Sequence, residues 1–337
     1  MVDQINNTYR FIPHLTEDKL KAEWIKCIQS CVQLYNQDNI SRTIAYQKFF
    51  FIHPEVKWAY LASMVSRNAG WNMTDLKGAT FPELINLKTR DLLFMTYERA
   101  NWSIFQDAFP QLLIYHYSTE YNKKMFHLLK EFHVSSFMEY EWNMYWDTRD
   151  ESRLVKALII NEQNLIQHPV IEHPVYKKRI FGSSLFYLEE HFHFCSVIFP
   201  TLNGELIGAS VHGFRHVDNR IELGKILFNI LFNPKYFHDF LEFSSTIKHT
   251  GSRTDYEGYC KNKLSTRTPP LHKAYKKVSH HWREIEDWSN HVNINPKWFE
   301  DPLLPKEVDL TEWFSQKQKQ LKRMVKVKKS LYHFLKK

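Results

Sequence analysis

The chain has 337 residues, enough for one large domain or two ordinary ones. Its residues are 43% apolar, 15% aromatic and 24% charged, with only 9 glycines. This excludes disordered and collagen-like chains and disfavours glycine-lined phosphate loops. The formal net charge is +8, but nine of the cations lie between Ser315 and Lys337, where no acid occurs. The remaining residues are close to neutral overall, so the charge gives no reason to expect a basic groove across the body.

Apolar residues at helical spacing predict a mainly α protein, a multi-helix array. Thr16, followed by Glu17 and Asp18, is an N-cap signal for a helix that extends to about Tyr35. Further helix starts are indicated at Ser41, Pro54 and Thr80. Periodic segments follow at 54–67, 82–98, 120–132, 137–147, 151–167, 219–232, 234–246 and 270–288. We expect a helical body over residues 1–314, with a junction between two subregions near 167–176.

The polar string from Ser66 to Leu76 is the most unusual local sequence. We interpret it as the C-terminus of the helix that begins near Pro54, with Gly70 as its left-handed cap. Its polar residues have two interpretations: a structural one, in which they cap the helices, and a functional one, in which they converge on a ligand. Side chains at the ends of rigid elements often bind ligands. The candidate binding residues are Arg67, Asn68, Asn72 and Asp75.

Residues 39–43, Tyr46, residues 53–55 and the string itself resemble the YppC-like family of uncharacterised Bacillus proteins. Residues 160–164 and 224–227 are similar to that family too. The resemblance covers most of the chain up to about residue 300. It implies a bacterial, intracellular setting, and it implies no activity, cofactor or catalytic residue.

Glu162 is a further candidate for ligand binding. It lies among apolar residues of a predicted helix, where a carboxylate needs polar or charged partners. Arg67 or Arg220 could supply them, either as a structural ion pair or as part of a site.

Residues 193–212 predict one small β-hairpin, because Asn203-Gly204 separates two apolar runs. Just before it, Glu190 and His193 form a Glu-x-x-His pair beside His191. Such a pair is half of the motif that di-iron helical bundles use, but the sequence holds no second copy. Chance spacing explains the pair as well. These three residues are the expected ligands if the protein binds a metal.

No established catalytic motif occurs in the sequence: there is no Gly-x-Ser-x-Gly, Walker loop, Gly-x-Gly-x-x-Gly or His-Glu-x-x-His. Whether the protein is an enzyme therefore stays open, and any cofactor is unknown.

Residues 315–337 predict a basic amphipathic helix. Apolar side chains share about half of its circumference, and most cations lie opposite, although Lys328 intrudes on the apolar side. Such a helix can lie on an anionic membrane or dock on a protein surface, including the chain's own body. Binding to nucleic acid phosphates is a less favoured alternative. The expected contact residues are Lys322, Arg323, Lys326, Lys329 and Lys336.

Four cysteines without a C-x-x-C pair indicate a reducing compartment. The N-terminus lacks a signal-peptide pattern, and no run reaches the roughly 18 apolar residues of a transmembrane helix. We expect a cytoplasmic protein, peripheral to the inner face of the membrane if the terminal helix attaches there. The leading functional hypothesis is a non-enzymatic binding protein with a polar pocket and a basic tail. The alternatives are a metal-dependent enzyme on an all-α scaffold and a nucleic-acid-binding protein.

Overall fold

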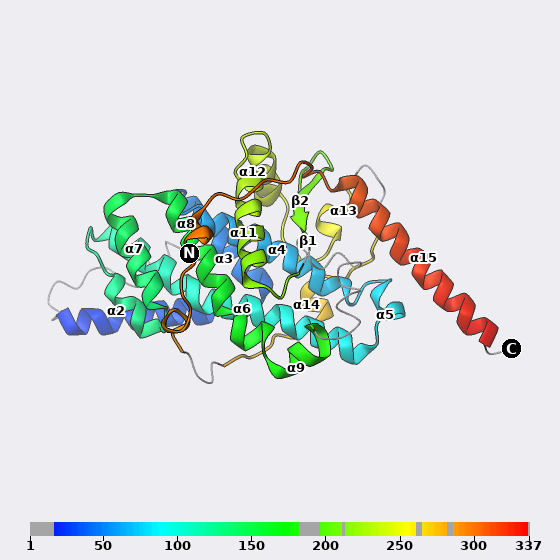
Figure 1. The fold of residues 1–337 in the computed structure, drawn as a ribbon, viewed down its shortest axis with the longest axis horizontal. Coiled ribbons are helices and arrows are strands. Elements are labelled where there is room, and N and C mark those ends of the chain that lie inside the picture. Colours follow the sequence, from blue (N-terminus) through cyan, green and yellow to red (C-terminus); the bar gives the residue numbers. More distant parts are fainter. Residues whose placement is uncertain (1–16, 182–195, 211–212, 261–264, 282–285, 336–337) are drawn as a thin grey trace.

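The computed structural model describes residues 17–181, 196–210, 213–260, 265–281 and 286–335, and helices make up most of them (Figure 1). The mainly α architecture is therefore confirmed. Among these residues, no helix is long and apolar enough to cross a membrane. The α-helices are α2 (Glu17–Tyr35), α3 (Asn39–Ile52), α4 (Trp58–Asp75), α5 (Phe81–Leu84), α6 (Leu87–Glu120), α7 (Ser136–Thr148), α8 (Glu151–Leu165), α9 (Pro174–Tyr176), α11 (Val217–Leu231), α12 (Phe237–Thr246), α13 (Thr254–Glu257), α14 (Leu271–Ala274) and α15 (Thr311–Leu335).

Short turns of tighter or wider helix connect several of these elements. Three are 3-10 turns, η1 (Phe126–Phe132), η4 (Trp288–Asn290) and η5 (Pro296–Phe299). Two are π turns, η2 (Gln167–Ile171) and η3 (Lys177–Phe181).

The predicted hairpin is confirmed. β1 (Ser196–Pro200) pairs antiparallel with β2 (Leu206–Ser210), and Pro200 lies opposite Leu206. Gly204 takes a positive φ of 82° in the connecting turn, as the Asn-Gly pair predicts. The outer edge of β2 is covered by the segment before α15, because Gly208 N donates to Val308 O and Leu310 N donates to Leu206 O, both at 2.8 Å.

Helix α4 lies at the centre of the molecule (Figure 1), and every residue of it except Val65 is buried. It begins at Trp58 and not near Pro54, which lies in the turn after α3. It also continues through the predicted cap, so the assignment of Gly70 as a C-terminal cap is wrong. Gly70 is needed for a different reason. A Cβ atom there would overlap Asn39 Oδ1 and would come 3.1 Å from the His249 ring, so only glycine lets these side chains reach the helix backbone.

Two other predicted segments differ from the structure. The helix expected at 82–98 is α6, which continues to Glu120 and passes through Pro110. The second half of α6 has no regular apolar periodicity, because polar side chains such as Asp107 and Gln111 are buried there. The helix expected at 270–288 ends at Ala274, where Tyr275 turns to extended backbone and stacks on the Phe94 ring at 3.7 Å between centroids.

Candidate functional site

A cavity of about 200 Å³ lies between α3, α4, α6, α8 and α11, and β1 and η2 complete its wall. An engineered apolar cavity of about 150 Å³ binds benzene, so this one has room for a molecule of that size or slightly larger. Most of the wall is apolar, as in typical small-molecule sites. Its apolar residues include Leu61, Ala62, Val65, Ala69, Leu93, Ile104, Ile166, Val170, Ile171, Val197, Leu223 and Leu227.

Glu162 carries the carboxylate of this wall. Its neighbours Leu158 and Ile160 are fully buried, whereas Glu162 itself is partly exposed and lines the cavity. Its Oε1 accepts a hydrogen bond from Gln163 Nε2 at 2.8 Å. Burial raises the pKa of Glu162 to about 7, although the nearby Gln163 and Trp58 side chains lower it in part. The carboxyl group therefore exchanges its proton close to neutral pH.

Neither arginine that we expected beside Glu162 pairs with it. Arg220 donates from Nε to Gln163 Oε1 at 3.0 Å, and thus reaches Glu162 only through the Gln163 amide. Arg67 lies elsewhere and donates to the backbone oxygens of Ser244 and Ile247. The expectation fails because the described hydrogen bonds of both guanidinium groups go to neutral acceptors elsewhere in the protein. Among the described residues, Glu162 has no ion-pair partner.

Two more polar side chains of the wall come from α3. Tyr46 is buried, and its hydroxyl has no hydrogen-bond partner in the described part of the chain. Burial and the charge of Glu162 raise the pKa of this hydroxyl, and both side chains line the cavity. Arg42 is neutralised by Glu98, with 2.6 Å between Nη2 and Oε2. The cavity thus combines an apolar wall with a phenol and a carboxylate that have spare hydrogen-bonding capacity.

The polar string of α4 contributes only part of the site. Asn68 and Asn72 line the cavity, but both also bind protein groups. Asn68 Nδ2 donates to Ser196 O at 3.3 Å and its Oδ1 accepts from Ile198 N at 3.2 Å, so it clamps β1. Asn72 Oδ1 and Asp75 both accept from Arg253. The four predicted residues therefore do not converge on one pocket.

The model of the family described as "Protein of unknown function (DUF2515)" matches residues 34–315. The chain belongs to the DUF2515 family. Over 310 residues it is 46% identical to the uncharacterized protein YppC of Bacillus subtilis (strain 168), covering 91% of this chain and 96% of that protein. No solved structure matches it. The family resemblance seen in the sequence is thus confirmed, and the matched range includes the whole cavity wall of this DUF2515 protein.

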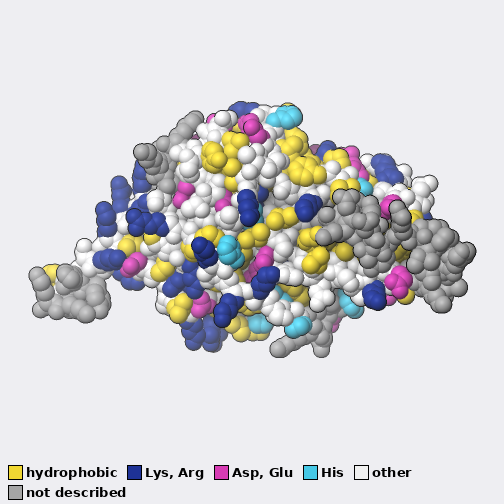
Figure 2. Space-filling view, turned by 180° about the vertical axis from the view of Figure 1, so that it is seen from behind, with side chains coloured by type: hydrophobic (Ala, Val, Ile, Leu, Met, Phe, Trp, Pro, Cys, Tyr) yellow, Lys and Arg dark blue, Asp and Glu magenta, His cyan; other side chains and the backbone are white. Residues whose placement is uncertain are grey.

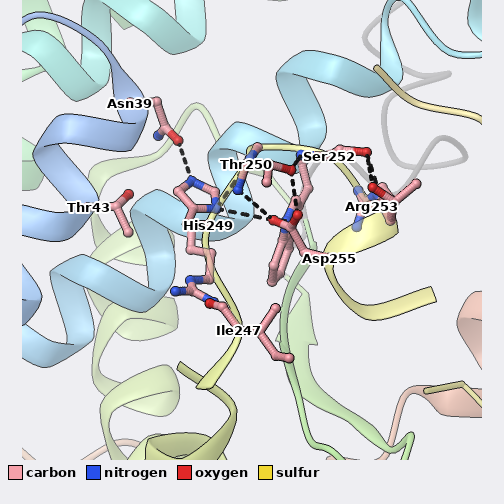
Figure 3. A network of polar contacts seen from close by, with 12 residues as sticks. Asn39, Thr43, Ile247, His249, Thr250, Ser252, Arg253 and Asp255 are labelled. Carbon is pink, nitrogen blue, oxygen red and sulfur yellow. Dashed lines mark hydrogen bonds and ion pairs between the residues drawn. The ribbon is translucent and has the colours of Figure 1, made fainter. Parts of the chain in front are cut away.

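A second polar cluster of the DUF2515 chain joins α4 to the segment after α12 (Figure 3). His249 Nε2 lies 2.9 Å from Asn39 Oδ1, and Gly251 N donates to His249 Nδ1 at 3.4 Å. Asp255 accepts from Thr250 N and from Trp71 Nε1, each at 3.1 Å.

Burial lowers the pKa of His249 to about 4, so the ring is neutral and its Nε2–H donates to Asn39. Both ring nitrogens are occupied inside the protein, so we assign a structural role to the cluster. The sequence analysis did not identify this cluster, because residues that meet across more than 170 positions leave no local pattern.

The predicted metal ligands Glu190, His191 and His193 lie outside the described residues. Within the part of this DUF2515 protein that is described, no group of three or more His, Cys, Asp or Glu side chains could hold a metal ion.

The predicted contact residues of the tail lie on α15, except that Lys336 falls outside the described range. Lys322, Arg323 and Lys326 are exposed. Lys329 forms an ion pair with Glu83, with 3.1 Å between Nζ and Oε1. The terminal helix, which we expected from residue 315, starts at Thr311.

Proposed function

We propose that this protein binds a small, mainly apolar molecule in the cavity, with a protonated amine of that molecule next to Glu162. The observation that carries the proposal is the position of Glu162: it lines a largely apolar cavity and has no cationic partner among the described residues. A carboxylate among apolar side chains is unfavourable when no cation offsets its charge. An ammonium group would supply the missing charge and would donate a charge-assisted hydrogen bond.

The surrounding residues support a cationic rather than an anionic ligand. Arg42 is already neutralised by Glu98, and Arg220 is hydrogen-bonded to Gln163 and Gln167. The charge of Arg42 is thus offset by Glu98, although its Nε has no hydrogen-bond partner among the described residues. Every nitrogen of the Arg220 guanidinium donates to a neutral protein acceptor. The Tyr46 hydroxyl, which has no partner in the described chain, can accept a second hydrogen bond from an ammonium group. The apolar wall would hold the hydrocarbon part of the ligand.

Calorimetric titration of the full chain with three probes of similar size tests this proposal. At pH 7.5 we expect benzylamine to bind, benzyl alcohol to bind more weakly and benzoate not to bind. Glu162→Gln should weaken benzylamine binding by about tenfold or more, since it removes a charge-assisted contact, and should change benzyl alcohol binding little.

Ala62→Leu, which adds bulk to the wall, should weaken both probes and serves as a control for the location of binding. Asn143→Ala, on α7 and away from the cavity wall, is the matched neutral control. Absence of binding by every probe, or equal benzylamine affinity in Glu162→Gln and the native chain, would contradict the proposal.

We also infer a cytoplasmic location. Three described cysteines, Cys27, Cys31 and Cys260, are free thiols, and free thiols persist in reducing compartments. Fractionation of Bacillus cells that express the chain, followed by thiol labelling, tests this. Reduced thiols in the cytoplasmic or inner-membrane fraction are expected, and recovery from the culture medium would contradict the location.

A further inference from the structure

The second half of α15 leaves the body of the protein (Figure 1). Phe314 and Leu321 in its first half are buried, each with 1% of the side chain exposed. Beyond Leu321 several apolar side chains are exposed instead, among them Val327 to 59% and Phe334 to 80%. The segment from residue 322 to residue 335 is roughly 21 Å long at 1.5 Å per residue. We call it the free half of α15.

The exposed apolar residues of the free half form one stripe. Met324, Val327, Leu331 and Phe334 follow one another at spacings of three, four and three residues, which places them on the same face of a helix. A contiguous apolar stripe at the surface usually marks a binding surface. Exposure of these apolar side chains to water is unfavourable, so we expect a binding partner to cover the stripe.

Cations border this stripe. Lys319, Lys322, Arg323 and Lys326 are exposed, and none forms an ion pair with another described residue. Figure 2 shows Lys and Arg side chains gathered on the part of the molecule where α15 projects. The sequence contains no acid from Ser315 to the C-terminus, so nothing on this segment offsets their charge. The occupant must therefore be anionic as well as apolar.

The free half contacts α5 through two lysines. Lys328 Nζ donates to Glu83 O at 2.7 Å, and Lys329 pairs with the Glu83 carboxylate. These contacts occupy the side of the helix that faces the body. The stripe and the exposed cations consequently remain on sides that no described part of the chain covers.

We propose that the free half of α15 lies on the surface of an anionic lipid membrane. The apolar stripe, Met324, Val327, Leu331 and Phe334, enters the boundary between headgroups and acyl chains. Lys322, Arg323 and Lys326, together with Lys319 just before the free half, contact lipid phosphates. This arrangement buries the stripe and neutralises the cations together, as basic amphipathic helices do at membranes. Nucleic acid would satisfy the cations but would leave the stripe in water, which is why we favour lipid.

Vesicle flotation with the full chain tests the proposal. Vesicles of phosphatidylglycerol and phosphatidylcholine should carry the protein upward, and vesicles of phosphatidylcholine alone should not. Replacement of the stripe by Val327→Ser, Leu331→Ser and Phe334→Ser should reduce binding at least about tenfold. Each of Lys322→Gln, Arg323→Gln and Lys326→Gln should reduce it about fivefold at low salt.

The matched control is Leu303→Ser with Leu304→Ser, which removes two other exposed apolar side chains outside the helix. This variant should float like the native chain. Circular dichroism should show that all variants remain folded, because the replaced side chains are exposed. Flotation of the stripe variant equal to that of the native chain would overturn the proposal, as would absence of flotation with anionic vesicles. Tight binding to a DNA duplex that the stripe variant retains, without vesicle binding, would favour nucleic acid instead.

Discussion

Arg253 and Asp75 form a buried ion pair, with Nη2 and Oδ2 2.7 Å apart and no more than 2% of either side chain exposed. The pair joins the segment after α12 to the C-terminal end of α4, where Asn72 accepts from the same guanidinium. Asp75 thus has a structural partner far away in the sequence. Within the polar string, Asp75 therefore has a structural role, whereas Asn68 and Asn72 also line the cavity.

We predict that Asp75→Asn or Arg253→Met destabilises the protein by about 3–5 kcal/mol, because each leaves a buried charge without its partner. Urea unfolding measures the loss. Lys57→Met, which breaks the half-exposed pair with Glu151, is the control and should cost about 1 kcal/mol or less. Benzylamine affinity of folded Asp75→Asn should equal that of the native chain, and a tenfold decrease would instead place Asp75 in the binding site.

Gly70→Ala is expected to destabilise the protein by about 2 kcal/mol or more, because its methyl group would overlap Asn39 and crowd His249. Gly258→Ala is the matched control, since nothing lies within 4 Å of a Cβ atom there and its φ is −65°. Thermal unfolding compares the two. Equal melting temperatures for the two variants would show that the close packing around Gly70 has no energetic weight.

Asn68→Ala should loosen the hairpin. It removes the acceptor of Ile198 N and the donor to Ser196 O, and a buried backbone group without a partner costs about 1–3 kcal/mol. Hydrogen exchange of the Ile198 amide should become faster by at least about tenfold. Asn101→Ala is the control, because the Asn101 amide donates only to Tyr97 O of its own helix. Unchanged exchange at Ile198 would argue against the clamp.

Glu162→Gln should stabilise the protein in a pH-dependent manner. The pKa of Glu162 is about 7 in the folded protein, above its usual value of 4.5. Between these values only the folded chain holds the proton, so stability falls as the pH rises from about 4.5 to about 7. At pH 8 the substitution should add up to about 3 kcal/mol, at ~1.4 kcal/mol per pKa unit.

Unfolding in urea at pH 8 and at pH 4.5 measures this difference. The native and Glu162→Gln chains should be nearly equal in stability at pH 4.5. A gain that is the same at both pH values would show that it does not come from the charge of Glu162. A Glu162→Gln chain that is more stable at pH 8 but binds benzylamine less tightly would show that the carboxylate lowers stability and serves binding.

The sequence predicts those parts of the fold whose signals are local. The helices α7, α8, α11 and α12 follow from amphipathic periodicity, and the hairpin follows from Asn203-Gly204. Prediction from the sequence fails where contacts between distant residues decide the structure. Gly70 has the same local context as a helix cap, but packing of α3 against α4 sets its role.

The candidate site shows the same limit. Glu162 was predicted from its apolar surroundings, and it does line the cavity. The prediction that Arg67 or Arg220 pairs with Glu162 was wrong. Arg220 is hydrogen-bonded to Gln163, which is in turn hydrogen-bonded to Glu162. The position of Gln163 between them depends on how α8 packs against α11. Tyr46 was not predicted as a site residue. A tyrosine among other aromatic residues carries no sign in the sequence that its hydroxyl lacks a partner.

The hairpin connects the cavity wall to the segment before α15. On one side β1 carries Val197 into the cavity wall and is clamped by Asn68, and on the other side β2 holds the segment that leads into α15. The two strands therefore connect the cavity wall to α15. The wall of the cavity and the base of α15 are thus joined through a two-stranded sheet of five residue pairs, from Ser196–Ser210 to Pro200–Leu206.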